Sequence, residues 1–210
     1  LDFDAVRRDP KLIIGFSDIT AIHEAMWSEA RLATIHGPVA AQFERGGVFT
    51  SSVWHATMST APVRVTADAA EPTFSVRTTG AAEGVLLGGN LCMLSTSVGT
   101  PFMPDLTGAI LLIEEVNEAA YRVDRMLTQL LNSGALNGVV GIALGQFTER
   151  RTSGAVTPSS VLMERLSGLG VPLLGGLSIG HGDINHAVPL GTQASLDADS
   201  GTLLVAAAAR

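Results

Sequence analysis

Apolar residues along this chain occur in two patterns, as short unbroken runs and at intervals of three or four residues. The runs predict buried strands over residues 11–15, 109–115 and 138–147. Helical spacing follows the first run over residues 19–30 and the second over residues 119–131. Strands that alternate with helices in this way indicate an α/β protein.

Cap and turn residues predict where further elements begin. Thr157 and Pro158 suit the N-cap and the first position of a helix that reaches about residue 166. Residues 39–45 follow a Gly-Pro break and predict a short helix. An Asp-Ser-Gly turn between residues 193–196 and 202–207 predicts a β-hairpin close to the end of the sequence.

The composition changes between Trp54 and Pro72, where Ser, Thr, Ala and Pro dominate without a clear period. Such a composition is typical of a connection between two lobes. The sequence therefore predicts two domains, residues 1–58 and residues 73–210, joined by a linker over residues 59–72.

Charge and cysteine content narrow the class of partner. A formal net charge of −7 without a basic cluster argues against nucleic acid and anionic membranes, which are bound largely through Lys and Arg. No apolar stretch approaches the roughly 20 residues of a membrane-spanning helix. Cys92 is the only cysteine, so neither an intrachain disulfide nor a thiolate-rich zinc site is expected. We expect a small-molecule partner and a reducing, cytoplasmic location.

The first residues have no initiator Met and none of the features of a signal peptide. This start predicts that the sequence is internal to a longer protein.

Ser17 lies between a predicted strand and a predicted helix, in the sequence Gly-Phe-Ser-Asp. A sharp turn there would present the hydroxyl above the sheet and direct helix N–H groups to the same point, as in a nucleophile turn with half an oxyanion hole. Ser is also a leading N-cap residue. These neighbouring residues alone leave both roles open.

Glu114 and Glu115 end the strongest predicted strand, and alternation directs them to opposite faces. Active-site side chains of open α/β sheets gather at such strand ends. The other reading is that both merely end a strand in a solvated turn. Glu118 and Arg122 are four residues apart on the next helix and predict an exposed ion pair.

His181 lies in a Gly-His-Gly loop, where small neighbours leave an imidazole accessible to act as a general base. An ordinary surface histidine is the simpler interpretation. His181, Asp183 and His186 also raise the question of a metal site, but their spacing matches no specific zinc motif. We therefore predict no metal and no cofactor.

These pieces, taken in order, resemble the LD-carboxypeptidase family of serine peptidases, which includes the microcin C self-immunity hydrolases. The resemblance covers essentially the whole chain. It rests on eight segments: KLIIGFSDIT (11–20), HGP (36–38), GGNL (88–91), GTP (99–101), LIEE (112–115), YRVDR (121–125), GHG (180–182) and PLG (189–191).

The resemblance implies a role for each candidate residue. Ser17 would be the nucleophile, His181 the general base and Glu114 the carboxylate that orients the base, with the Asp18 amide as one oxyanion donor. The family usually has Asp where this chain has Glu115. The family also has a Gly-rich turn before this point that supplies a second oxyanion donor. Substrate contacts are expected from His36, Gly37 and Asn90.

The family's architecture implies the C-terminal part of a Rossmann-like domain followed by a smaller α/β domain. The implied reaction is release of a terminal D-alanine from a muropeptide tetrapeptide. The expected partner is therefore a small peptide substrate, and a homodimer is the assembly that we expect if the protein forms one. One alternative is hydrolysis of an acyl-adenylate such as processed microcin C, for which Trp54 is a weak candidate as aromatic platform. Another is a catalytically silent binding module for a small ligand.

Overall fold

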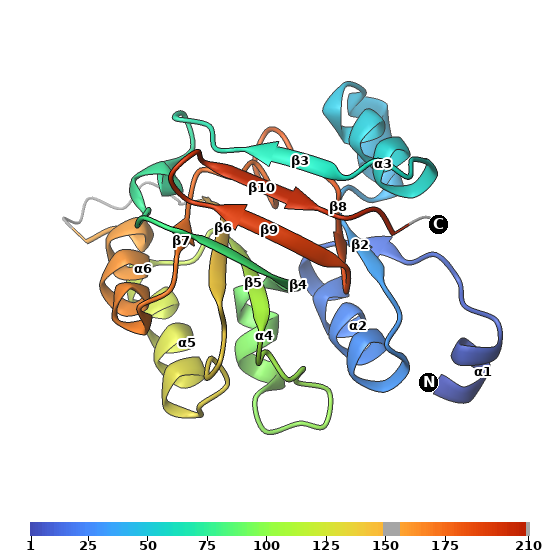
Figure 1. The fold of residues 1–210 in the computed structure, drawn as a ribbon, viewed down its shortest axis with the longest axis horizontal. Helices are drawn as coiled ribbons and strands as arrows, with labels where there is room; N and C mark the ends of the chain where they lie inside the picture. The colour runs from blue at the N-terminus through green and yellow to red at the C-terminus, as the bar shows by residue number, and fades with distance from the viewer. Residues whose placement is uncertain (149–155, 209–210) are drawn as a thin grey trace.

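A computed structural model describes residues 1–148 and 156–208, and it contains two sheets with helices against both (Figure 1). The strand order is β1-β2-β8 in the smaller sheet and β3-β10-β9-β4-β5-β6-β7 in the larger one. The strands are β1 (Ile14–Gly15), β2 (Thr34–His36), β3 (Val63–Thr66), β4 (Ala81–Asn90), β5 (Ala109–Val116), β6 (Gly141–Thr148), β7 (Leu173–Leu174), β8 (Val188–Leu190), β9 (Gln193–Asp197) and β10 (Thr202–Val205). The α-helices are α1 (Phe3–Arg8), α2 (Thr20–Ala25), α3 (Val48–Met58), α4 (Leu91–Ser97), α5 (Ala120–Asn132) and α6 (Pro158–Leu166).

The parallel half of the larger sheet comprises β4, β5, β6 and β7. Helices α4, α5 and α6 connect these strands in turn and lie together on one side of the sheet (Figure 1). β9, β10 and β3 continue the sheet from β4 in antiparallel order. The carboxyl ends of the parallel strands therefore lie along one edge, where α/β proteins usually place their active sites.

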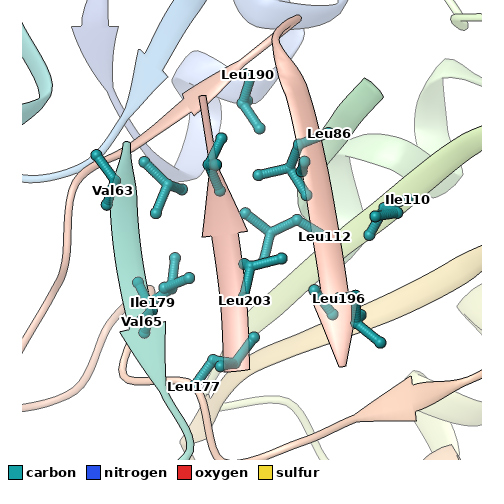
Figure 2. Close-up of a cluster of buried hydrophobic side chains, with 14 of the residues drawn as sticks. Val63, Val65, Leu86, Ile110, Leu112, Leu177, Ile179, Leu190, Leu196 and Leu203 are labelled. Carbon is teal, nitrogen blue, oxygen red and sulfur yellow. The ribbon is translucent and has the colours of Figure 1, made fainter. Parts of the chain in front are cut away.

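Strand alternation divides the apolar residues of the larger sheet between two cores. Leu111 and Ile113 of β5 pack with the helix layer. Ile110 and Leu112 of the same strand pack with β2, β8 and the antiparallel strands (Figure 2). The helix layer is amphipathic, and Val123, Leu127 and Leu130 of α5 form its buried stripe, as the helical spacing predicts. All three are buried.

Several predicted elements are confirmed. These are the two buried strands β5 and β6, helix α5, helix α6 with Thr157 as its side-chain cap, the hairpin of β9 and β10, and the exposed ion pair of Glu118 and Arg122 at 3.3 Å. The mixed α/β class is confirmed as well.

Other segments differ from the prediction. The helix expected over residues 19–30 is divided into a 3₁₀ turn (Ser17–Ile19), α2 and a π-helical turn (Met26–Ala30) that ends at Arg31 in the left-handed region. Residues 39–45 form a 3₁₀ helix, Ala40–Arg45, and not an α-helix.

The stretch expected to be a connection contains regular structure. It begins within α3 and contains β3, which pairs with β10, because Val63 and Val65 alternate inward with exposed neighbours. Short alternating strands of this kind are hidden in a Thr- and Ala-rich composition. The division into two domains around residues 59–72 stays a prediction.

Candidate active site

Ser17 follows the carboxyl end of β1 and begins a 3₁₀ turn that leads into α2. Its φ of 61° lies in the left-handed region, which costs a residue other than glycine about 1–3 kcal/mol and is often found at active sites. No side-chain cap is present at the start of the 3₁₀ turn or of α2. Ser17 therefore does not cap the helix, which was the second role that the sequence left open.

Two hydrogen bonds hold this turn against its neighbours. His23 Nε2 donates to the carbonyl oxygen of Gly15 at 3.0 Å, so Nε2 carries the ring proton. The Asn90 amide donates to Thr20 Oγ1 at 2.9 Å. Gly89 has no Cβ, and one built there would lie 2.5 Å from Thr20 Oγ1, so glycine permits the close approach of α2 to β4.

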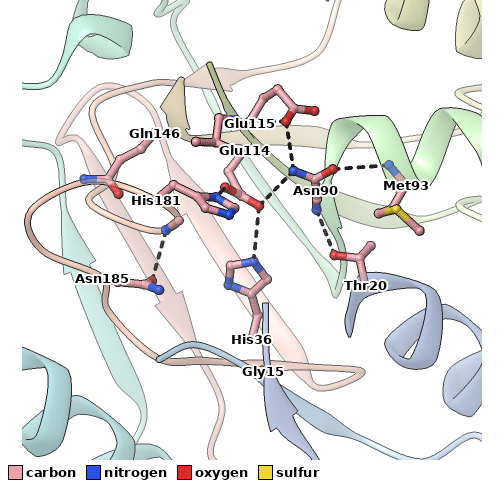
Figure 3. Close-up of polar contacts among 12 residues, drawn as sticks. Gly15, Thr20, His36, Asn90, Met93, Glu114, Glu115, Gln146, His181 and Asn185 are labelled. Atoms are coloured by element: carbon pink, nitrogen blue, oxygen red, sulfur yellow. Dashed lines mark hydrogen bonds and ion pairs between the residues drawn. The ribbon is translucent and has the colours of Figure 1, made fainter. Parts of the chain in front are cut away.

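Glu114 ends the β5 face that carries Ile110 and Leu112, and its side chain is fully buried (Figure 3). Its Oε2 lies 2.6 Å from His181 Nδ1, and its Oε1 lies 3.9 Å from His36 Nε2. Burial on its own raises the pKa of Glu114, but the two histidines outweigh burial and the pKa lies below its ordinary value. Glu114 is therefore an ionised acceptor for the His181 ring.

Glu115 points to the other face, as alternation predicts, and among the described residues it forms no hydrogen bond or ion pair with His181. It accepts hydrogen bonds from the Cys92 and Val116 amides, both at 2.8 Å, and from Asn90 Nδ2 at 3.0 Å. Burial raises the pKa of this carboxyl, and these donors offset only part of the effect. Its contacts tie the end of β5 to the start of α4.

The loop after β7 places His181 against Glu114. Gly180 has a φ of 125°, and a Cβ at this position would lie 2.6 Å from Glu114 Oε2. Only glycine therefore lets the loop backbone pass over the carboxylate. The Gly180 amide also donates to Asn185 Oδ1 at 3.0 Å.

His181 also contacts the segment that carries Ser17. Its ring centroid lies 4.6 Å from that of Phe16, the residue directly before Ser17, and its side chain is 15% exposed. Ser17 itself is partly exposed. The fold thus brings together three segments that are far apart in the sequence. The aromatic ring beside His181 is that of Phe16 and not that of Trp54, which is 61% exposed on α3.

The three residues expected to contact substrate are buried in this structure. His36 is completely enclosed, and neither ring nitrogen has a hydrogen-bond partner among the described residues. Gly37 is buried beside Ala187. Asn90 Nδ2 donates to Glu115 and, at 3.4 Å, to Glu114, while its Oδ1 caps α4 by accepting from the Met93 amide. Direct contact of these residues with substrate stays a prediction.

Sequence reasoning missed Phe16, Gln146 and Asn185. Gln146 lies near the end of the predicted strand over residues 138–147, so the strand-end rule that selected Glu114 applies equally to it. Asn185 had no signal beyond its closeness to His181.

Neither a metal centre nor a membrane span appears in the described parts of the chain. No group of three or more His, Cys, Asp or Glu side chains could hold a metal ion within residues 1–148 and 156–208. In the same residues, no helix is long and apolar enough to cross a bilayer.

Comparison with known proteins gives matches over both halves of the sequence. Residues 83–196 match the LD-carboxypeptidase C-terminal domain, and residues 1–37 match the LD-carboxypeptidase N-terminal domain. The chain belongs to the LD-carboxypeptidase family.

Three relatives illustrate the range of this LD-carboxypeptidase family. A carboxypeptidase-family protein of Streptomyces coelicolor is 41% identical over 207 residues, which are 97% of this chain and 65% of the relative. The crystal structure of muramoyltetrapeptide carboxypeptidase from Oxalobacter formigenes is 31% identical with a TM-score of 0.85, over 98% of this chain and 70% of that one. The microcin C7 self-immunity protein of Escherichia coli is 26% identical over 98% of this chain and 68% of the relative. The chain thus spans about two thirds of the length of these LD-carboxypeptidase relatives.

Proposed function

We propose that this protein is a serine LD-carboxypeptidase that releases the terminal D-alanine from muropeptide tetrapeptides. The observation that carries the proposal is the 2.6 Å contact between His181 Nδ1 and the buried Glu114, beside a serine in a left-handed turn. The muramoyltetrapeptide carboxypeptidase of Oxalobacter formigenes supports the choice of substrate, since the match covers 98% of this chain and 70% of that one.

The contact with Glu114 determines which nitrogen of His181 does the chemistry. An ionised carboxylate only accepts, so Nδ1 carries the proton and Nε2 has a free electron pair. We assign Nε2 to take the proton of Ser17 as its Oγ attacks the carbonyl carbon of the scissile amide. The protonated ring then gives this proton to the leaving amine of D-alanine, and Glu114 stabilises the charged imidazole.

Water resolves the acyl-enzyme by the reverse sequence of proton transfers. His181 takes a proton from water, hydroxide attacks the acyl carbon, and the proton returns to Ser17 Oγ as the peptide acid leaves. The Asp18 amide is the proposed oxyanion donor, because the first N–H groups of a helical turn have no partner within it. One such donor typically contributes about 10²–10³ in rate.

The test is to incubate the full chain with a purified muropeptide tetrapeptide and to measure tripeptide and free D-alanine by mass spectrometry. Wild type is expected to release both in equal amounts. Ser17→Ala should lower kcat by about 10⁴-fold with little change in KM, because the hydroxyl acts in the covalent step. An alanine variant that stays folded and cleaves at the wild-type rate would exclude Ser17 as nucleophile.

The same assay separates the alternatives. Turnover of a processed microcin C analogue without turnover of the tetrapeptide would favour the self-immunity activity. Tight binding of the tetrapeptide without release of D-alanine would favour a binding module.

A further inference from the structure

Gln146 connects the histidine loop to a distant segment through both ends of its carboxamide. It lies on β6 and is 2% exposed. Its Oε1 accepts from the Gly182 amide at 2.6 Å, and its Nε2 donates to Glu71 Oε1 at 2.7 Å. Figure 3 shows Gln146 beside the loop that carries His181.

We propose that Gln146 is a positioning residue for the reaction: it fixes the loop backbone after His181, and Glu71 fixes Gln146. This inference rests on the proposed function, in which His181 is the general base. Gln146 would act through His181 and would not touch the substrate.

The hydrogen bonds define the orientation of the carboxamide without ambiguity. A Glu71 carboxylate accepts only, so the NH₂ group of Gln146 must face it. The carbonyl oxygen is then left for the Gly182 amide. A Cβ on Gly182 would lie 2.1 Å from Gln146 Nε2, so the backbone is packed directly on the carboxamide.

The loop is held on both sides of His181. Before it, the Gly180 amide donates to Asn185, and the Gln146 backbone amide donates to the Ile179 carbonyl at 2.8 Å. After it, Gln146 Oε1 is the acceptor for Gly182. Catalytic groups displaced by about 1 Å lose about 10² in rate, so an anchor next to the base should appear in kcat.

A charge exchange between Glu71 and Gln146 tests this chain of contacts in the full-length protein. Gln146→Glu places two carboxylates against each other and should lower kcat about 10²-fold with little change in KM. Glu71→Gln should stay close to wild type, because the new carboxamide still offers an oxygen to Gln146. The double variant Glu71→Gln/Gln146→Glu restores an amide opposite a carboxylate, and we expect it to recover most of the lost rate.

The second readout is hydrogen exchange of the Gly182 amide by NMR, which does not depend on activity. Slow exchange is expected in wild type and in the double variant, and fast exchange in Gln146→Glu. Equal kcat and equal Gly182 exchange in wild type and Gln146→Glu would overturn the inference. A double variant whose kcat is no higher than that of Gln146→Glu, or a double variant that fails to fold, would also overturn it. A wild type that does not cleave muropeptides refutes the proposed function instead, while Gly182 exchange still decides whether Gln146 holds the loop.

Discussion

Glu24 should make the protein less stable as the pH rises, and replacing it by Gln should remove this dependence. Glu24 lies on α2 and is 3% exposed. Its one hydrogen bond among the described residues is from Ser97 Oγ at 3.3 Å. Burial, which this hydrogen bond offsets only in part, raises the pKa of Glu24 from 4.5 to about 8.

The sign of the effect follows from proton linkage. Between pH 4.5 and pH 8 the unfolded chain has lost the Glu24 proton and the folded chain has kept it. The folded state then binds more protons, so the free energy of unfolding falls as pH rises through this interval. Each pKa unit corresponds to about 1.4 kcal/mol, so the loss across the interval is on the order of 3–5 kcal/mol.

Wild type alone shows this loss in full only above pH 6.5, because at lower pH His23 acts in the opposite direction. Burial lowers the pKa of His23 from 6.5 to about 4, so its contribution to stability is lost as pH falls below 6.5. The two slopes offset each other between pH 4.5 and pH 6.5. The difference between wild type and Glu24→Gln isolates the carboxyl group, since Gln keeps its size and can still accept from Ser97.

Urea unfolding at pH 5, 6.5 and 8 measures the effect by linear extrapolation. The two proteins should have similar free energies of unfolding at pH 5, and Glu24→Gln should be more stable by about 3–5 kcal/mol at pH 8. The exposed Glu44→Gln is the matched control and should show no pH-dependent difference from wild type. A difference between Glu24→Gln and wild type that stays constant from pH 5 to pH 8 would refute the reasoning.

Two further predictions concern the site. Glu114→Gln should lower kcat by about 10⁴-fold, because without the carboxylate the His181 tautomer is no longer fixed. Glu115→Gln should keep kcat within about tenfold of wild type. Steady-state kinetics measure both variants, and equal losses of kcat would contradict the assignment of Glu114. Gly180→Ala should cost about 1–3 kcal/mol and most of the activity, because its Cβ meets Glu114 at a φ of 125°. Gly168→Ala, where a Cβ meets nothing within 4 Å, is the matched control in thermal unfolding, and an unchanged Gly180→Ala would contradict the steric argument.

Local patterns in the sequence were sufficient for much of the larger sheet. Strand β5 is an unbroken apolar run and helix α5 has a strong helical period, and both are predicted within about one residue of their ends. β3 was missed because two inward valines between polar residues are a weak signal. The interruption of the first helix by a π-helical turn after Ala25 has no signal in the periodicity, because the apolar spacing continues through it.

The identity of the orienting carboxylate shows where local reasoning ends. Alternation predicts that Glu114 and Glu115 face opposite ways, and this is confirmed. Alternation cannot say which face meets the histidine. That depends on β8, which follows the His181 loop and pairs antiparallel with β2, so that the chain returns to the β1–β2 sheet on the Glu114 face.

The pairing of β8 with β2 therefore connects the sequence to the proposed chemistry. It places Val188 opposite His36, whose Nε2 lies 3.9 Å from Glu114 Oε1. The His181 loop must then cross the end of β5 on the same face. Ser17 lies close by because β1 runs parallel to β2 and its last residue, Gly15, pairs with His36. Family resemblance could name Ser17, Glu114 and His181 together because it carries such long-range pairing implicitly. Gln146 and Asn185 belong to none of the segments that carry the resemblance, and only the three-dimensional structure places them beside the histidine loop.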